Sequence, residues 1–261
     1  MQLAKEEAEK ILSVVLDIAE SMLNCGAEVS RVEDTIRRIC MSYGAQRVHP
    51  FVITSSIVVT IQLSNEAAIT QTRRVGGNMT DFTRLEELND LSRKICKYQY
   101  PVEKMTELYQ EKIVATIPDK SVYRKTFFGY LIATFSFAVF FGGNVYDGIA
   151  ALAIAAVLWL IDHYFRRIIN NQMLYLIIAS FCMGSMAVIV GAIAPVFHQD
   201  KIIIGDIMIL IPGLAMTNAI RDIFSGDTIS GMLKLCESLI QAGMIAIGTV
   251  SAILLIGGRF G

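Results

Sequence analysis

The stretch ILIPGLAMTNAIRD, residues Ile209–Asp222, combines an apolar composition with a helix break and a set of polar side chains. Pro212 lacks a backbone donor and disrupts the helix that precedes it, and Gly213 follows directly. Inside a bilayer, such a break is tolerated where the freed backbone groups meet protein, water or a ligand. Two interpretations follow: a simple proline kink that ends at the water interface, or part of a path for a solute.

Polar side chains follow the break at Thr217, Asn218, Arg221 and Asp222. Arg221 and Asp222 are sequence neighbours and so do not face each other on a helix. The guanidinium fork of Arg221 suits an anionic carboxylate, and a helix that restarts after the break points free N–H groups at such an anion. Asp206, before the break, is either a carboxyl group that titrates during transport or a helix-terminal acid in water.

The composition divides the chain into a charged part and an apolar part. The 261 residues are 54% hydrophobic, with a mean hydropathy of +0.51 and a formal net charge of −1, and most charged residues precede position 126. This balance does not indicate a nucleic-acid partner. Five cysteines without CxxC spacing favour reduced thiols over a disulfide framework, and the N-terminus does not resemble a secretory signal.

The charged part predicts an α+β domain over residues 1–120. Apolar residues at helical spacing predict a helix over residues 4–23, and Ser30 with Glu33 has the form of a capping box for a second helix that ends at Gly44. Residues rich in Val, Ile and Thr then predict one bent strand or two strands over Val48–Leu63, and another over Ala67–Val75.

A turn and two further helices complete this domain. Gly76-Gly77-Asn78 predicts the turn, and Thr83 with Glu86 has the form of a cap for a helix that reaches about Lys97. Pro101 separates this helix from one over Val102–Thr116. The linker Pro118-Asp119-Lys120 leads to the apolar part.

The apolar part predicts a membrane domain of about five transmembrane helices over residues 121–261. The segments are Thr126–Tyr146, Gly148–Ile161, Met173–Phe197, Ile202–Ile220 and Ser238–Gly258. Basic residues gather on one side of these segments, at Arg124, Lys125, Arg166, Arg167, Arg221 and Lys234, with Lys201 and Arg259 on the other. The positive-inside rule therefore places the N-terminal domain in the cytoplasm.

A stripe of small residues runs along the third apolar segment, at Ser180, Gly184, Ala187 and Gly191. Small residues let helix backbones approach closely, either within the chain or against a partner subunit. The odd number of segments also suggests an incomplete membrane unit.

The sequence carries no catalytic or metal-binding signature such as GxSxG, HExxH or a phosphate-binding loop, so we expect neither an enzyme nor a cofactor or metal site. His163 beside Asp162 suits a proton relay or an interfacial anchor. Near the second helix start lies a polar cluster of Glu28, Arg31, Glu33 and Asp34, which suits a gate, a solute site or, for Glu33, a simple cap.

Two stretches resemble the hallmarks of the threonine/serine exporter family: NCGAEVSRVED at Asn24–Asp34 and LIPGLAMTNAIRD at Leu210–Asp222, with FSGDTISG at Phe224–Gly231 following. The resemblance covers nearly the whole chain. By position, the family motifs fall on Gly26, Ala27, Glu28, Ser30, Arg31, Glu33, Pro212, Gly213, Asn218, Arg221 and Asp222.

This resemblance implies a multi-pass protein of the bacterial inner membrane that exports small amino acids or small carboxylates, driven by the proton gradient. The longest members carry a second membrane half, so the chain resembles the larger protein of a split pair with a smaller membrane partner. Split pairs are associated with dicarboxylates such as succinate, and a homo-oligomer also remains open. The alternative function is a membrane-anchored module in which the cytosolic domain senses a metabolite.

Overall fold

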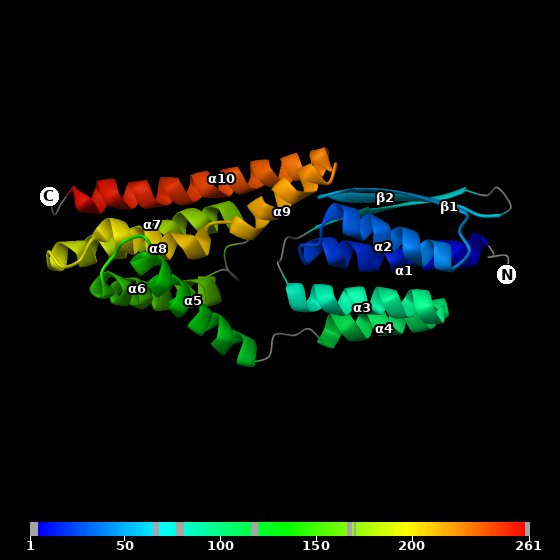
Figure 1. The fold of residues 1–261 in the computed structure, drawn as a ribbon, viewed down its shortest axis with the longest axis horizontal. Helices are drawn as coiled ribbons and strands as arrows, with labels where there is room; N and C mark the ends of the chain where they lie inside the picture. Colours follow the sequence, from blue (N-terminus) through cyan, green and yellow to red (C-terminus); the bar gives the residue numbers. More distant parts are fainter. Residues whose placement is uncertain are drawn as a thin grey trace. The chain divides into compact units, whose positions relative to one another are not determined.

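The computed structural model describes residues 5–64, 68–76, 81–115, 120–165, 169 and 171–258. The chain forms two compact units, each described here by itself. Unit 1 contains Met1–Ile117 and Leu214–Leu235, and unit 2 contains Pro118–Gly213 and Cys236–Gly261. Unit 1 therefore combines the expected N-terminal domain with a helical hairpin that comes from the predicted membrane domain (Figure 1).

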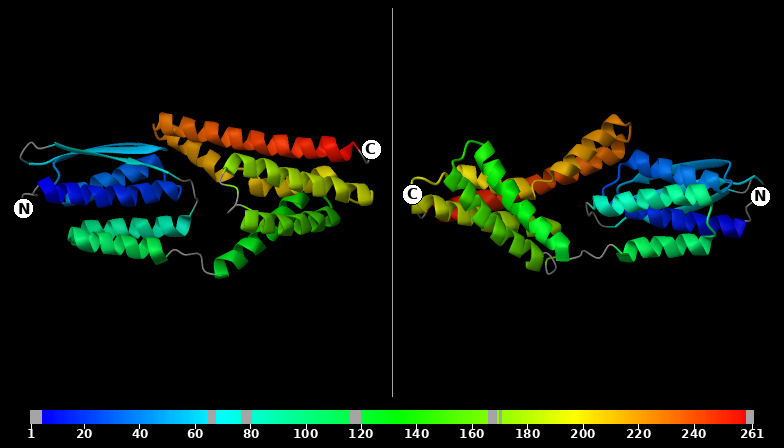
Figure 2. Two further views of the ribbon diagram at one scale, coloured as in Figure 1. Left: turned by 180° about the vertical axis from the view of Figure 1, so that it is seen from behind. Right: turned by 60° about the horizontal axis from the view of Figure 1, so that its bottom comes forward.

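Unit 1 is built in three layers, with a sheet and a helix pair on either side of a central helix pair (Figures 1 and 2). The central pair is α1 (Lys5–Asn24) and α2 (Val29–Ser42). The sheet has antiparallel strands in the order β1 (Arg47–Ile53), β2 (Ser56–Gln62) and β3 (Ala68–Arg74). The outer pair is α3 (Phe82–Tyr98) and α4 (Val102–Ala115).

The layers explain the apolar pattern of the sequence. Alternate residues of β2, such as Ile57 and Val59, are buried because only one face of the sheet packs on helices. Helix α1 is buried on most of its circumference, since it contacts β3, α2, α3 and α4. Leu12, Met22 and their neighbours thus form the centre of a single core.

The structure confirms the predicted helices and strands but moves two helix starts. Two strands, not one bent strand, occupy Val48–Leu63. The cap of α2 is Glu28 rather than Ser30, and its side chain makes no capping bond. The cap of α3 is Asp81 rather than Thr83, since its carboxylate accepts a hydrogen bond from the Arg84 N–H at 3.0 Å.

Some sequence predictions fall outside the described residues. These are Gly77 and Asn78 of the predicted turn, Pro118 and Asp119 of the linker, and the basic residues Arg166, Arg167 and Arg259.

Unit 2 is a helical bundle with an apolar exterior. Its helices are α5 (Lys120–Phe140), α6 (Val145–Phe165), α7 (Gln172–Ile193) and α8 (Gln199–Leu210), with the second part of α10 (Thr228–Ala252) and the π-helix η1 (Ile253–Gly257). Large apolar side chains such as Phe140, Ile193 and Leu254 are exposed on this unit. An apolar exterior is typical of helices that face lipid or a partner.

Among the residues that the structure describes, three helices are long and apolar enough to cross a membrane: α6, α7 and α10 with η1. Helix α8 and the following α9 (Gly213–Phe224) form a fourth candidate if they are taken as one span, bent by 57° at the break. Within the described residues, α5 does not qualify. The uncharged run predicted as Thr126–Tyr146 is wrong as a single helix, because a turn at Gly142 ends α5 and Tyr146 belongs to α6.

The small-residue stripe of α7 packs within the chain. A Cβ atom at Gly184 would lie 3.0 Å from the Ala252 side chain of α10, and one at Gly248 would collide with Ser180 at 2.1 Å. Ser180 and Gly184 are therefore part of an α7–α10 interface inside unit 2. Ala187 is buried in a core cluster that α7 shares with α5, α6 and α8.

Candidate functional site

The first motif forms the turn between α1 and α2. Gly26 adopts a positive φ of 93°, which favours glycine, and its N–H bonds the Leu23 carbonyl at 2.9 Å. This turn brings Glu28 to the start of α2, with extended backbone and a side chain that is free of any capping role. The Gly26 carbonyl and the Glu28 carboxylate can therefore accept contacts from outside the turn.

The second motif forms a tight hairpin of α9 and the start of α10. A Cβ atom at Gly231 would lie 2.6 Å from the Ala219 carbonyl oxygen, so only glycine allows the two helices to approach this closely. The hairpin is also fastened by an ion pair in which Asp222 Oδ2 and Lys234 Nζ are 2.7 Å apart. The Asp222 side chain is 1% exposed and that of Lys234 is 19% exposed.

The two motifs meet in unit 1, and we call their contact the motif junction: Gly26, Glu28, Ser30, Asn218, Arg221 and Asp227. The Arg221 guanidinium pairs with the Glu28 carboxylate, and the Asn218 amide lies 3.5 Å from the Gly26 carbonyl. The Asp227 carboxylate accepts a hydrogen bond from the Ser30 backbone N–H. Each contact joins residues almost two hundred positions apart, so the hairpin is a structural part of the N-terminal unit.

Asp222 and Arg221 have separate partners, as their adjacency in sequence predicts. Arg221 pairs with Glu28, whereas Asp222 pairs with Lys234. The Arg221 and Glu28 side chains are 56% and 29% exposed, so their pair is open to solvent and to a competing ion. The buried pair within the hairpin thus holds the exposed pair in place.

The capping role predicted for Glu33 is wrong, because its carboxylate accepts a hydrogen bond from the Val52 N–H of β1 at 3.2 Å. Ser230 Oγ also donates to the Val52 carbonyl, at 3.4 Å. Burial raises the pKa of Glu33, and the nearby Asp227 carboxylate adds to this rise. Burial likewise raises the pKa of Asp227, with a further contribution from Asp222.

The helix break lies where the sequence predicts it. Helix α8 ends at Leu210, the Gly213 N–H bonds the Ile211 carbonyl at 2.8 Å, and α9 begins at Gly213. Thr217 is exposed on α9, one residue before the half-buried Asn218. Of the predicted path residues, the structure therefore brings Asn218 and Arg221 to the motif junction.

Asp206 occupies a different kind of site, inside α8 in unit 2. It is fully buried, and neither carboxylate oxygen has a hydrogen-bond partner within the described residues. The alternative of a helix-terminal acid in water is wrong, because α8 begins seven residues earlier, at Gln199. A Cβ atom at the adjacent Gly205 would lie 2.9 Å from the Thr134 carbonyl oxygen, which shows that α8 and α5 pack closely at this level.

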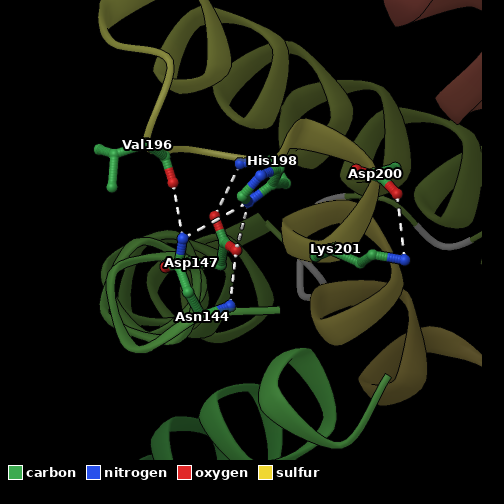
Figure 3. A network of polar contacts seen from close by, with 6 residues as sticks. All are labelled: Asn144, Asp147, Val196, His198, Asp200 and Lys201. Atoms are coloured by element: carbon green, nitrogen blue, oxygen red, sulfur yellow. Dashed lines mark hydrogen bonds and ion pairs between the residues drawn. The ribbon is translucent and has the colours of Figure 1, made fainter. Parts of the chain in front are cut away.

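Asp147 is a second buried carboxylate of unit 2, which sequence reasoning did not single out (Figure 3). It accepts hydrogen bonds from the Asn144 N–H at 2.8 Å and the His198 N–H at 2.7 Å, and its N–H donates to Asn144 Oδ1. This reciprocal pair is a cap for α6, and the Asn-x-x-Asp spacing was its signal in the sequence. Both carboxylate oxygens of Asp147 therefore accept hydrogen bonds, whereas those of the equally buried Asp206 have no such partner within the described residues.

Asp162 and His163, the pair for which the sequence suggests a proton relay or an interfacial anchor, contact different side chains. The Asp162 carboxylate accepts a hydrogen bond from the Tyr175 hydroxyl at 2.8 Å, while His163 stacks on Trp159 with ring centroids 5.4 Å apart. Within the part of the chain that the structure describes, no group of three or more His, Cys, Asp or Glu side chains is placed to hold a metal ion.

Comparisons with known proteins agree with these motifs. A family model described as a putative threonine/serine exporter matches residues 13–256. A protein of Mycobacterium tuberculosis named as a probable threonine/serine exporter is 21% identical over 243 residues, which are 92% of this chain and 45% of that relative. The chain thus spans less than half the length of the relative, and no solved structure matches it. Since the family model covers nearly all of it, the chain belongs to the family of putative threonine/serine exporters.

Proposed function

We propose that this chain is a subunit of a secondary exporter that moves small amino acids of the threonine and serine type out of the cell. The observation that supports this proposal best is the Glu28–Arg221 pair, which joins the two motifs through the helix that follows the break. Broken helices with polar groups beside the break form the substrate sites of many secondary transporters. The proposed activity is transport, in which the solute is moved without chemical change.

The same pair favours an amino acid over a dicarboxylate. An amino acid carries a carboxylate, which a guanidinium such as Arg221 binds in a bidentate manner, and an ammonium group, which a carboxylate such as Glu28 accepts. Such a zwitterion can replace the direct ion pair with one contact to each partner. A succinate-like dicarboxylate satisfies Arg221 alone and is repelled by Glu28, so it is the second substrate class of the proposal.

Asp206 is the residue that we propose to carry the coupling proton. Burying an ionised carboxylate without a partner costs far more than burying a neutral carboxyl group. Asp206 has no hydrogen-bond partner within the described residues and lies in a helix directly before the break. If Asp206 gains a proton on one side of the membrane and loses it on the other, each change of charge would alter the stability of the packing around α8.

We further propose that the protein lies in the bacterial inner membrane with its N-terminal domain in the cytoplasm, and that α5 is the fifth membrane helix. A smaller membrane protein would supply the helices that correspond to the rest of the longer relative, of which the chain spans 45%. The alternative function, a membrane-anchored metabolite sensor, predicts binding by this chain without transport.

The test is counterflow of labelled threonine, serine and succinate in proteoliposomes, with and without a small membrane protein encoded beside this gene. The variants are Glu28→Gln and Arg221→Gln. The matched control is Glu107→Gln with Lys104→Gln, which removes another exposed ion pair of unit 1, with N–O distance 2.9 Å. We expect threonine counterflow to fall strongly in the two junction variants and to persist in the control.

Two results would contradict the proposal. If no solute moves under any condition, the exporter function is wrong. If succinate moves faster than threonine, and Glu28→Gln accelerates it, the substrate is a dicarboxylate and the zwitterion argument fails.

A further inference from the structure

A charged cleft lies between one face of α2 and one face of α3, within the described part of unit 1. Its volume is about 430 Å³, within the range of small-molecule sites. The cleft is lined by Arg31, Asp34, Thr35, Arg38, Asn89, Ser92, Arg93, Cys96 and Lys97. Arg31 belongs to the first family motif and lines this cleft.

Positive charge predominates in the cleft. Asp34 is the single carboxylate among its lining residues, and its Oδ2 lies 2.7 Å from the Arg38 guanidinium. The Arg93 guanidinium lies 3.6 Å from the carboxylate of Asp90. Asp90 does not line the cleft, and its carboxylate also pairs with the Lys94 ammonium. Arg31 and Lys97 have no ion pair within the described residues, and the Lys97 ammonium lies 5.2 Å from the centre of the Tyr98 ring. Neither cation is neutralised by a carboxylate there, so both can bind an anionic ligand.

The uncharged polar groups of the cleft are already used inside the helices. The Thr35 hydroxyl donates to the Arg31 carbonyl at 2.9 Å, and the Ser92 hydroxyl donates to the Asn89 carbonyl at 2.7 Å. The Asn89 amide donates to the Leu85 carbonyl at 2.8 Å. Most donors that remain for a ligand therefore belong to arginine and lysine, which select an anion.

The positions of these cations indicate more than one anionic group on the ligand. Arg31 and Arg38 lie two turns apart on α2, and Arg93 and Lys97 lie one turn apart on α3. A ligand that contacts cations on both helices and at both ends of the cleft therefore needs negative charge at more than one point. Arginine binds phosphate oxygens in a bidentate manner, and lysine is a frequent phosphate ligand.

We propose that this cleft binds a small molecule that carries two or more phosphate groups, bridging α2 and α3. The proposal is independent of the exported substrate, because the cleft and the Glu28–Arg221 pair share no residue. The concave shape and the acidic side chains Asp34 and Asp90 around it favour a compact ligand over an extended nucleic acid.

The experiment is calorimetric titration of the full chain in neutral detergent, at constant ionic strength, with inorganic pyrophosphate, ATP and citrate as probes. The test variant is Arg31→Gln with Lys97→Gln. The control is Arg47→Gln with Lys5→Gln, which removes the same charges from exposed positions elsewhere in unit 1. All these side chains are exposed, and an unchanged melting temperature will show that each variant is folded.

We expect saturable binding of pyrophosphate or ATP with a Kd below about 1 mM, a weak affinity by the usual scale. In the test variant, Kd should rise at least tenfold, which corresponds to about 1.4 kcal/mol, and in the control it should change less than about twofold. The proposal is overturned if neither phosphate probe saturates, if both variants lose affinity equally, or if citrate binds as tightly as ATP.

Discussion

Removing Asp222 should destabilise the α9–α10 hairpin far more than removing an exposed charge. The Asp222 carboxylate is almost fully buried and lies 2.7 Å from the Lys234 ammonium. In Asp222→Ala, the lysine keeps its charge in a largely buried position. Breaking a fully buried pair costs about 3–5 kcal/mol. Because Lys234 keeps 19% of its side chain exposed and water can reach it, we expect a loss of about 2–3 kcal/mol.

The double variant Asp222→Leu with Lys234→Met tests the cause of this loss. It removes both charges and keeps apolar volume, and such replacements of buried pairs are often neutral or stabilising. One oxygen of Asp222 has no hydrogen-bond partner within the described residues, so this pair is incompletely satisfied and its replacement should be well tolerated. We therefore expect the double variant to be within about 1 kcal/mol of the wild type.

The assay is thermal unfolding of the purified chain in detergent at a fixed scan rate. For a chain of this size, about 1 kcal/mol shifts Tm by about 2–4 °C, so Asp222→Ala should melt about 4–12 °C lower. Glu107→Ala, which breaks an exposed pair, should cost less than about 1 kcal/mol. The reasoning is refuted if Asp222→Ala costs no more than Glu107→Ala, or if the double variant melts as low as the single one.

Four further results are expected. Pro212→Ala should reduce counterflow more than it reduces the amount of folded protein, and an equal loss of both would show that the break is only structural. Gly231→Ala should cost about 1–3 kcal/mol in thermal unfolding because its Cβ atom overlaps the α9 backbone, whereas Gly243→Ala on the same helix, with nothing within 4 Å, should not. The Cys40 thiol, buried with its pKa raised to about 12, should react with N-ethylmaleimide only after denaturation; rapid labelling of the native protein would contradict its burial. Because the pKa of Asp227 is raised in the folded protein, its contribution to stability is present below the ordinary carboxyl pKa and is lost as pH rises through the raised value. Asp227→Asn should therefore flatten the fall in Tm above pH 4. An unchanged slope of Tm against pH would refute this.

Local patterns in the sequence predict the elements of unit 1 because each element buries one face. The period of 3.6 residues indicates α1 and α2, and alternation indicates β2, since these periods follow directly from backbone geometry. Helix starts are less certain, because several side chains compete for the cap. Ser30 has the residue type of a cap, but the extended backbone before α2 occurs at Glu28.

Helix ends in the apolar part are harder to predict from the absence of charge. The uncharged run around Phe140 and Tyr146 continues through a turn, because the turn itself contains no charged residue. The signal was present in Gly142-Gly143-Asn144, where Gly142 has a φ of 90° and Asn144 caps α6. Turn chemistry therefore locates these ends better than a count of uncharged residues.

The motif junction could not be predicted from local patterns. Glu28 and Arg221 are 193 positions apart, and nothing in the period of either helix specifies a partner at that separation. The sequence also left the burial of Asp206 open, because the residues around it in α8, from Ile202 to Leu210, are apolar on every side and do not reveal which face packs inside. Family resemblance marked both motifs as important but did not indicate that they touch.

The division into units changes the meaning of the Pro212–Gly213 break. The chain passes from unit 2 to unit 1 between Gly213 and Leu214. The break therefore coincides with the boundary between two sets of packing contacts. In an unbroken helix, the direction and rotation of α8 would fix those of α9. Asn218 and Arg221 of α9 contact the first motif, so α9 needs an orientation of its own. Proline removes that constraint by interrupting the backbone hydrogen bonds. A structural role and a role in transport are therefore compatible. Measuring the amount of folded Pro212→Ala protein and its counterflow separately distinguishes a break that supports packing alone from one that also forms part of the solute path.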